Sequence, residues 1–198
     1  MRLFYAPASP FAAKVRMAAS HCGLELDEVA VDTAAEPTEL LAANPLGKIP
    51  TLVTDEGNPV FDSSVICDLF DRMSGNQLVP QPIDEWQAIK TFEATVDGVI
   101  DALLLTVYEV RYRPEDKRYD GWVDKQIRKG DRGLVLLDQR LDQLPTELTT
   151  AHFALAGLLG WMNLRFPGKA AGEFPRLAAW LDAFCEANPA LAAFVPQG

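Results

Sequence analysis

The sequence predicts a small α/β domain followed by an all-helical domain. Over residues 1–75, short apolar stretches alternate with segments of helical period. A polar stretch that contains prolines, NQLVPQPIDE, then fills residues 76–85 and has the composition of a linker. From residue 86 through residue 198, apolar residues recur mostly every three or four positions. We therefore expect domains at 1–75 and 86–198, joined by a linker at 76–85.

The first domain begins with a short apolar strand, MRLFYA, and continues with an amphipathic helix that starts at Pro10. Its apolar stripe recurs at i, i+4, i+7 and i+11, at Phe11, Val15, Ala18 and Cys22. Further apolar runs and turn residues predict a strand at 26–31, a short helix at 37–44, strands at 49–53 and 59–61, and a helix that Asp62 or Ser63 caps and that ends near Met73. The order is β-α-β-α-β-β-α, and the hairpin of the last two strands makes the sheet mixed.

The second domain is predicted to be helical throughout. A period of three and four runs through residues 89–110 and indicates one long helix. The stretch YRPEDK interrupts it, and Pro114 is a suitable first residue for the next helix, which Pro145 ends. Residues 149–162 are strongly apolar, so we expect a buried central helix there. The last amphipathic helix is predicted at 175–187.

Composition and charge argue against several classes of partner. Apolar residues make up 48% of the chain and charged residues 23%, as in ordinary globular proteins. The net charge of −10 argues against nucleic acid, because phosphate binding needs clustered Lys and Arg. No segment has the roughly 20 uninterrupted apolar residues that span a bilayer, and the N-terminus lacks the pattern of a signal peptide. We therefore expect a cytoplasmic protein with neither nucleic acid nor membrane as a partner.

The three cysteines, Cys22, Cys67 and Cys185, are far apart and form no C-x-x-C motif. An odd and dispersed set argues against a disulfide framework, a zinc site and a dithiol redox centre. We therefore expect all three to be buried as small apolar residues, and we expect no metal site.

Four stretches, YAPASPFAAKVRM, NPLGKIPTLV, FDSSVICDLFD and FPRLAAWLDAF, resemble segments of one known family. In this order and spacing, the chain resembles the cytosolic glutathione S-transferases over nearly its whole length. The most similar subgroup is the bacterial transferases with a catalytic serine. The resemblance implies a thioredoxin-like first domain that binds glutathione as a co-substrate. It also implies a helical domain that supplies most of the electrophile pocket, and a homodimer.

Ser9 is the candidate catalytic residue. A free thiol has a pKa of roughly 8.5, and only its thiolate attacks an electrophile well, so the site must favour the anion. Ser9 carries a hydroxyl and stands at the N-terminus of the helix that Pro10 starts, where an anion is stabilised. Two alternatives remain open. Ser9 is only a helix cap, or Tyr5, near the end of the first strand, serves the thiol as a tyrosine does in other classes of the family.

Two further stretches contain the residues that the resemblance assigns to glutathione. In GKIP it implies a cis peptide bond before Pro50 and a backbone pairing of Ile49 with the cysteinyl unit of glutathione, as in an added strand. It also implies that Lys48 points toward the carboxylate side of the bound peptide. In FDSS, Asp62 and Ser63 stand where the family has Glu or Gln and then Ser, which bind the γ-glutamyl ammonium and carboxylate. The alternatives are that Pro50 is a trans proline at the start of an edge strand, that Lys48 is only solvated, and that Asp62 or Ser63 is only an N-cap.

The long helix contains candidates of a second kind. Asp97 and Asp101 share one face at i, i+4. The resemblance makes Asp97 a candidate contact to glutathione bound by the partner subunit of a dimer; a solvated or capping acid is the alternative. Tyr108 and Tyr112 also share a face and, together with Phe11, are candidates for the electrophile pocket. Packing between helices is the alternative for the tyrosines.

The start of the central helix departs from the family pattern. Thr149 fits the usual capping box, Ser/Thr-x-x-Asp, but His152 stands in place of the acid. A neutral histidine still accepts a backbone N–H, so we interpret His152 as structural.

Charge in the first domain predicts a modest affinity for glutathione. Residues 1–75 contain five cations and eleven acids, a surplus of six negative charges, and glutathione itself carries two carboxylates. No Lys or Arg lies between Arg16 and Lys48. The sequence therefore predicts a glutathione S-transferase that conjugates the thiolate to a small apolar electrophile, whose identity stays open. The alternative is a binding or adaptor module with the same fold and no catalysis.

Overall fold

The computed structural model describes residues 1–196; residues 197–198, which end the predicted second domain, lie outside the described part. The first part of the chain forms a four-stranded sheet of order β2-β1-β3-β4, in which the strands span Asp27–Ala30, Arg2–Tyr5, Thr51–Val53 and Pro59–Val60. β1 is parallel to β2 and antiparallel to β3, so Phe4 lies opposite both Val29 and Thr51. β3 and β4 form an antiparallel hairpin. The predicted mixed sheet is confirmed.

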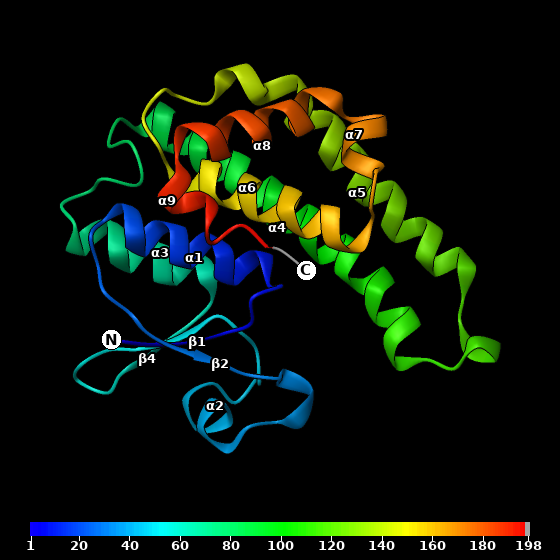
Figure 1. The fold of residues 1–198 in the computed structure, drawn as a ribbon, viewed down its shortest axis with the longest axis horizontal. Coiled ribbons are helices and arrows are strands. Elements are labelled where there is room, and N and C mark those ends of the chain that lie inside the picture. Colours follow the sequence, from blue (N-terminus) through cyan, green and yellow to red (C-terminus); the bar gives the residue numbers. More distant parts are fainter. Residues whose placement is uncertain (197–198) are drawn as a thin grey trace.

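Helices cover the two faces of this sheet unequally (Figure 1). α1 (Pro10–His21) and α3 (Ser63–Met73) lie on one face, whereas the short α2 (Thr38–Ala43) lies on the other. A single 3₁₀ turn, Thr33–Ala35, precedes α2. The order β1-α1-β2-α2-β3-β4-α3 is the predicted one, and the face with α2 stays partly uncovered.

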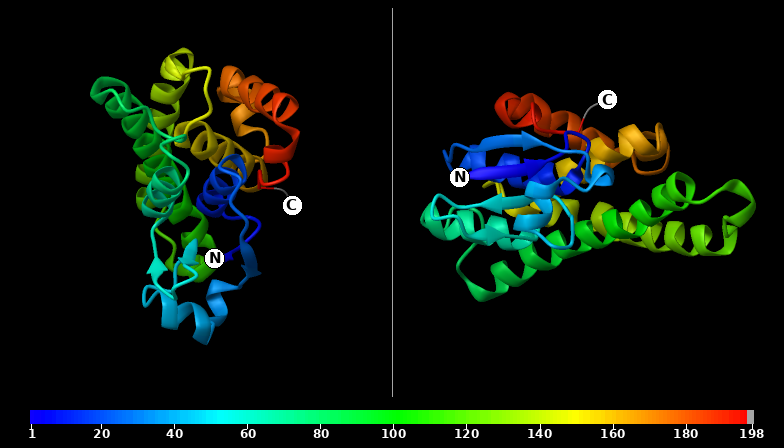
Figure 2. Two further views of the ribbon diagram at one scale, coloured as in Figure 1. Left: turned by 90° about the vertical axis from the view of Figure 1, so that its left-hand side faces the viewer. Right: turned by 90° about the horizontal axis from the view of Figure 1, so that it is seen from below.

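The rest of the described chain is helical. α4 (Ile83–Tyr112) and α5 (Asp120–Arg140) run antiparallel, and their joined ends project beyond the rest of the molecule (Figures 1 and 2). The helices that follow are α6 (Thr150–Arg165), α7 (Lys169–Glu173), α8 (Pro175–Ala187) and α9 (Pro189–Ala192). Within residues 1–196, none of these helices combines the length and the apolar character that a membrane span requires.

Several helix boundaries differ from the prediction. α4 begins at Ile83, ahead of the period at residues 89–110 that predicted this helix and directly after Pro82, which is disfavoured inside a helix. Pro114 starts only a 3₁₀ turn, and α5 begins at Asp120. The carboxylate of Glu109 accepts the backbone N–H of Tyr119 at 3.0 Å and so anchors the connection just before α5. α5 ends at Arg140, short of the predicted end before Pro145, and a 3₁₀ turn, Leu141–Gln143, follows. α7 and α9 were not predicted, because segments of four or five residues are too short to show a helical period.

α6 is the buried centre of the molecule. Its side chains from Thr150 to Met162 are all buried, as the apolar sequence predicts. Gly157 lets the α6 backbone approach α1, because a Cβ at this position would lie 2.6 Å from the carbonyl oxygen of Pro10. One continuous hydrophobic core therefore joins the sheet domain to the helices.

The cysteines are all free. Cys67 is fully buried, which confirms the prediction for this residue, and burial raises the pKa of its thiol. Cys22 and Cys185 are only partly buried, although both pack against the hydrophobic core.

Candidate functional site

A cavity of about 250 Å³ lies between the loop before β3, the N-terminus of α3 and one face of α4. It brings together five candidates for binding glutathione, Lys48, Ile49, Pro50, Asp62 and Ser63. Phe11, a candidate for the electrophile pocket, and Asp97, a candidate contact to the partner subunit's glutathione, line the same cavity. Every residue that was a candidate for binding glutathione within one subunit thus lines the same cavity.

The loop before β3 presents an unpaired stretch of backbone to this cavity. The peptide bond between Ile49 and Pro50 is cis, as the resemblance implied. Neither the N–H nor the C=O of Ile49 has a hydrogen-bond partner among residues 1–196. Both groups are therefore available to an extended ligand that pairs with the chain as a strand does.

Asn44 holds this loop in place and was missed by the sequence analysis. Its side chain is buried, and its Nδ2 donates to the Lys48 carbonyl at 3.1 Å and to Thr51 Oγ1 at 3.0 Å. Its Oδ1 accepts the N–H of Leu46 at 3.0 Å, and Thr51 Oγ1 donates to the same Lys48 carbonyl at 2.8 Å. The sequence analysis places Asn44 only at the end of the helix predicted at 37–44, and its side chain also fixes the Lys48–Ile49 segment.

The N-terminus of α3 forms the opposite wall. Asp62 is its N-cap: Oδ1 accepts the N–H groups of Ser64 at 3.0 Å and Val65 at 3.4 Å. Ser63, the first helical residue, is nearly buried. The peptide bond between Phe61 and Asp62 is also cis. This wall combines one carboxylate with the backbone N–H groups of a helix start, so it can bind an ammonium and a carboxylate side by side.

Ser9 caps α1, and its Oγ accepts the backbone N–H of Ala12 at 3.2 Å. Within the described residues, the hydroxyl proton of Ser9 has no acceptor, so it can be donated to a ligand. Ser9 itself does not line the cavity, but Phe11, two positions later, does. Its role as a cap is confirmed.

Tyr5, the alternative hydroxyl, lies in a different environment. The guanidinium of Arg16 lies 4.6 Å from the centroid of the Tyr5 ring and 4.6 Å from that of Phe194. The same guanidinium donates to both carboxylate oxygens of Glu28, at 2.6 and 2.8 Å. Tyr5 does not line the cavity.

Asp97 stands on the α4 wall of the cavity and is bound by its own chain. Lys14, which is fully buried, donates to both oxygens of Asp97, at 3.0 and 2.7 Å, and to Oε1 of Glu93 at 3.0 Å. Burial raises the pKa of Asp97 even though Lys14 opposes it. Burial also acts on Glu93, but Lys14 and Lys90 together hold its pKa below the usual value. The α4 wall of the cavity is therefore held by a buried network of ion pairs around Lys14.

Asp101 also lines the cavity, one helical turn beyond Asp97. Burial raises the pKa of Asp101; the Lys48 ammonium opposes this shift and the Asp62 carboxylate adds to it. Leu46 and Phe61 complete the lining residues that the sequence analysis did not select for the site.

Tyr108 and Tyr112 do not line this cavity with Phe11. They stand further along α4, 39% and 58% exposed, with their ring centroids 5.3 Å apart in an edge-to-face contact. Burial raises the pKa of Tyr108, and Tyr112 adds to the shift. The prediction that Tyr108 and Tyr112 share a face of α4 is confirmed, but neither side chain lines the cavity.

His152 completes the capping box of α6, as expected. The backbone N–H of Thr149 donates to Nδ1 of His152 at 3.1 Å, and Nε2 lies 3.1 Å from the Pro145 carbonyl. Burial lowers the pKa of His152 to about 4, so the ring is neutral at pH 7 and Nε2 carries the proton that Pro145 accepts. The structural role of His152 is confirmed.

Within residues 1–196, His, Cys, Asp and Glu side chains form no group that could hold a metal ion.

The Lys14 network is the other feature that sequence reasoning missed. Its sequence signal is a lysine on the apolar stripe of α1, between Phe11 and Ala18.

Family models match both parts of the chain. Residues 8–73 match the N-terminal domain of glutathione S-transferase, and residues 120–183 match its C-terminal domain. The uncharacterized GST-like protein YibF of Escherichia coli is 30% identical over 169 residues, which cover 83% of each chain.

Solved structures agree with these matches. A glutathione S-transferase from Methylobacterium radiotolerans, in complex with glutathione sulfonate, has a TM-score of 0.92 and 32% identity, over 100% of this chain and 95% of that one. A glutathione S-transferase from Methylobacillus flagellatus with GSH bound has a TM-score of 0.91 and 32% identity, over 99% of each chain. The predicted thioredoxin-like domain followed by a helical domain is confirmed. The chain therefore belongs to the glutathione S-transferase family.

Proposed function

We propose that this protein is a glutathione S-transferase that conjugates the thiolate of glutathione to a small apolar electrophile. The observation that carries the proposal is the unpaired backbone of Ile49, which lines one cavity together with Lys48, Asp62 and Ser63. Two similar enzymes hold glutathione or its sulfonate in their structures. We further propose that the protein works as a cytoplasmic homodimer.

The cavity offers a complementary group to each part of glutathione. The Ile49 N–H and C=O pair with the cysteinyl unit as an added strand. Asp62 uses only Oδ1 to cap α3, so Oδ2 accepts from the γ-glutamyl ammonium. The backbone N–H of Ser63, at the start of α3, binds the γ-glutamyl carboxylate. Lys48 attracts the glycyl carboxylate.

Ser9 is the residue that we propose for activating the thiol. Its hydroxyl proton is unused by the described residues, and the N-terminus of α1 favours a nearby anion. Tyr5 is the weaker choice, because its ring packs against the Arg16 guanidinium. We therefore assign the hydrogen bond to the sulfur to Ser9.

Two other assignments remain part of the proposal. Asp97 is a contact to glutathione in the partner subunit of the homodimer, a role that it would share with its ion pair to Lys14. Phe11 forms the inner wall of the electrophile pocket, and Tyr108 and Tyr112 form an outer, more exposed extension along α4.

The decisive experiment is the Ser9→Ala variant, with Tyr5→Phe as its matched control. We expect Ser9→Ala to raise the pKa of the bound thiol by about one unit or more, because a hydrogen bond to an anion is lost. The rate of conjugation to chlorodinitrobenzene should fall roughly tenfold or more. Tyr5→Phe should change neither quantity.

The thiol is followed by its ultraviolet absorbance during a pH titration of the complex with glutathione. If Ser9→Ala leaves both the titration and the rate unchanged, Ser9 is only a cap. If Tyr5→Phe alone raises the thiol pKa, the assignment moves to Tyr5.

A second candidate function is a binding or adaptor module without catalysis. The observation that favours it is the surplus of acids at the cavity, where Asp62, Asp97 and Asp101 face a single lining cation, Lys48. Calorimetry separates the two functions. Heat of binding with glutathione at millimolar concentration supports the transferase, and no heat at that concentration supports the adaptor.

A further inference from the structure

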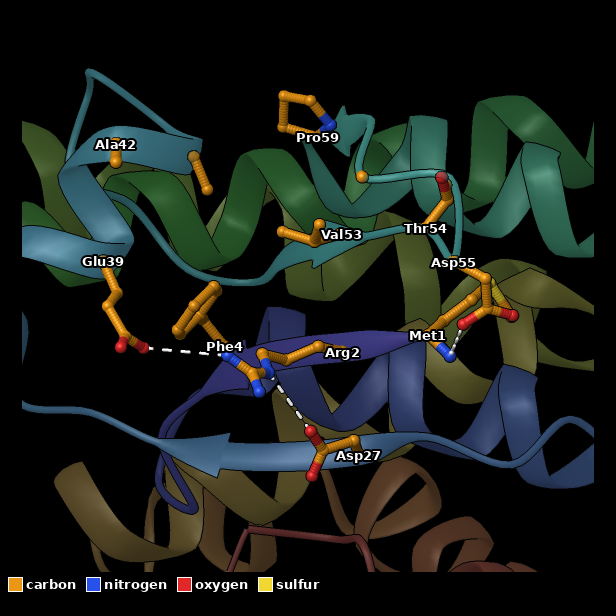
Figure 3. Close-up of a pocket in the computed structure, with 12 residues that line it drawn as sticks. Met1, Arg2, Phe4, Asp27, Glu39, Ala42, Val53, Thr54, Asp55 and Pro59 are labelled. Atoms are coloured by element: carbon orange, nitrogen blue, oxygen red, sulfur yellow. Dashed lines mark hydrogen bonds and ion pairs between the residues drawn. The ribbon is translucent and has the colours of Figure 1, made fainter.

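A second and larger cavity, of about 620 Å³, opens on the face of the sheet that α1 and α3 do not cover. It lies between β1, β3 and β4 on one side and α2 on the other (Figure 3). It shares no lining residue with the candidate glutathione site. Its volume is within the range of cavities that hold small organic ligands.

The floor of this cavity is apolar. Phe4 and Val53 come from the central strands, Ala42 and Ala43 from α2, and Pro59 from β4. Figure 3 shows Phe4 and Val53 on adjacent strands, with α2 and Pro59 beside them. Because α2 has only six residues, Ala42 and Pro59 stay exposed and Val53 is half-buried, whereas Phe4 is buried beneath them. An apolar ligand body can therefore bind without displacing protein side chains.

The rim carries charges of both signs, with more acids than cations. Arg2 donates from Nε to Asp27 at 3.1 Å, and its Nη1 lies 3.8 Å from Glu39 Oε2. The amino group of Met1 donates to Asp55 at 2.7 Å. Three carboxylates, from β2, α2 and the β3–β4 turn, thus face two cations (Figure 3).

Glu39 is the acid of this rim that is least engaged by the protein. Its ion pair with Arg2 is 3.8 Å long, its side chain is 73% exposed, and among residues 1–196 it makes no hydrogen bond. Asp27 and Asp55, in contrast, each accept a hydrogen bond. Glu39 therefore has both oxygens available to a cationic ligand at the edge of the apolar floor.

We propose that this cavity binds a small organic cation, with its apolar body on Val53, Ala42 and Pro59 and its charged group at Glu39. The surplus of negative charge at the rim and over residues 1–75 favours a cation over an anion of the same shape. Arg2 competes with the ligand for Glu39 and thereby lowers the affinity. Because the two cavities share no lining residue, glutathione and the cation do not compete for the same groups.

The test compares two probes with the same aromatic body, benzyltrimethylammonium and phenylacetate, on the full chain at low salt. Amide chemical shifts and calorimetry follow the titration up to about 10 mM, the range in which weak ligands are detected. We expect saturable binding of the cation, with shifts centred on Phe4, Glu39 and Val53, and no saturation with the anion. Saturating glutathione should not displace the cation.

Variants then test the assignment to Glu39. Glu39→Gln should weaken the cation roughly threefold to fivefold, as expected for the loss of an exposed charge pair, whereas Glu147→Gln, elsewhere on the surface, should change nothing. Arg2→Gln should strengthen binding, because it removes the competing cation; a purely structural role for Arg2 predicts the opposite. The proposal is overturned if the cation fails to saturate, if the anion binds equally well, if the shifts centre on Lys48 and Ser63, or if Glu39→Gln and Arg2→Gln have no effect.

Discussion

The ammonium of Lys14 lies 2.7 Å from Oδ2 of Asp97, and this ion pair links α1 of the sheet domain to α4 of the helical domain. Lys14 also donates to Glu93, which accepts from Lys90 at 2.9 Å and from the hydroxyl of Thr150 at 2.8 Å. The network therefore connects α1, α4 and α6 at the wall of the candidate site.

Removing Lys14 alone should lower the stability of the protein much more than removing Lys14 together with the charges of Glu93 and Asp97. Lys14→Met leaves two carboxylates that lack their buried cation, and we expect the free energy of unfolding to fall by about 3–5 kcal/mol. A triple variant, Lys14→Met with Glu93→Gln and Asp97→Asn, removes the charges together and should recover a large part of this loss. Urea denaturation measures both. If the triple variant is less stable than Lys14→Met, charge burial is not the cause.

Asn44 should affect affinity for glutathione more than it affects the chemistry. Asn44→Ala removes the three hydrogen bonds that hold the segment from Leu46 to Thr51, so Lys48 and Ile49 lose their fixed position. We expect the dissociation constant for glutathione to rise roughly tenfold, with a smaller change in kcat.

Asn188→Ala is the matched control for Asn44→Ala. Asn188 also donates from Nδ2 to a backbone carbonyl, that of Phe184 at 2.9 Å, but it does not line the cavity. Calorimetry with glutathione compares the two variants. Equal affinities would show that the loop keeps its shape without Asn44.

His152 should make the protein sensitive to mild acid. Its pKa is about 4 in the folded protein and roughly 6.5 in an unfolded chain, so between these values the unfolded state binds a proton that the folded state does not. Stability is therefore fully present above pH 6.5 and falls as the pH drops toward 4. The shift corresponds to roughly 3 kcal/mol.

The His152→Asn variant tests this origin. Asparagine can still accept the N–H of Thr149 but does not titrate, so the variant should lose some stability at pH 7 and lose less on acidification than the parent protein. Urea midpoints at pH 7 and pH 5 provide the comparison. His21 contributes in the same direction, because burial also lowers its pKa. An unchanged pH dependence in His152→Asn would contradict the assignment.

The site could be predicted from sequence where its chemistry depends on local segments. Lys48, Ile49 and Pro50 are adjacent, as are Asp62 and Ser63, and each group stands at a strand or helix start that turn residues and caps mark. The fold then brings the two groups to one cavity. Local pattern therefore marks these segments as strand and helix starts, and the resemblance to the glutathione S-transferases assigns their residues to glutathione.

Contacts between distant residues could not be predicted in this way. Lys14 is 79 and 83 positions before its partners Glu93 and Asp97, and nothing in the helical period of α1 identifies an acid on another helix. Tyr108 and Tyr112 show a second limit of prediction from helical period. A period of i, i+4 shows that two side chains share a face, but it does not show how far along α4 the enclosed cavity extends.

Gly157 offers a test of the packing that positions Ser9. A Cβ at Gly157 would lie 2.6 Å from the Pro10 carbonyl oxygen, so Gly157→Ala forces α6 and the N-terminus of α1 apart. We expect a loss of about 1–3 kcal/mol in the free energy of unfolding and a lower rate of conjugation, because Ser9 directly precedes Pro10. Gly98→Ala is the matched control, since no atom lies within 4 Å of a Cβ on this exposed helical glycine. That variant should gain up to about 1 kcal/mol, because alanine favours the helix. Urea denaturation and the chlorodinitrobenzene assay compare the two variants, and equal stability and rate in both would exclude close contact between α6 and α1 as the reason for glycine at position 157.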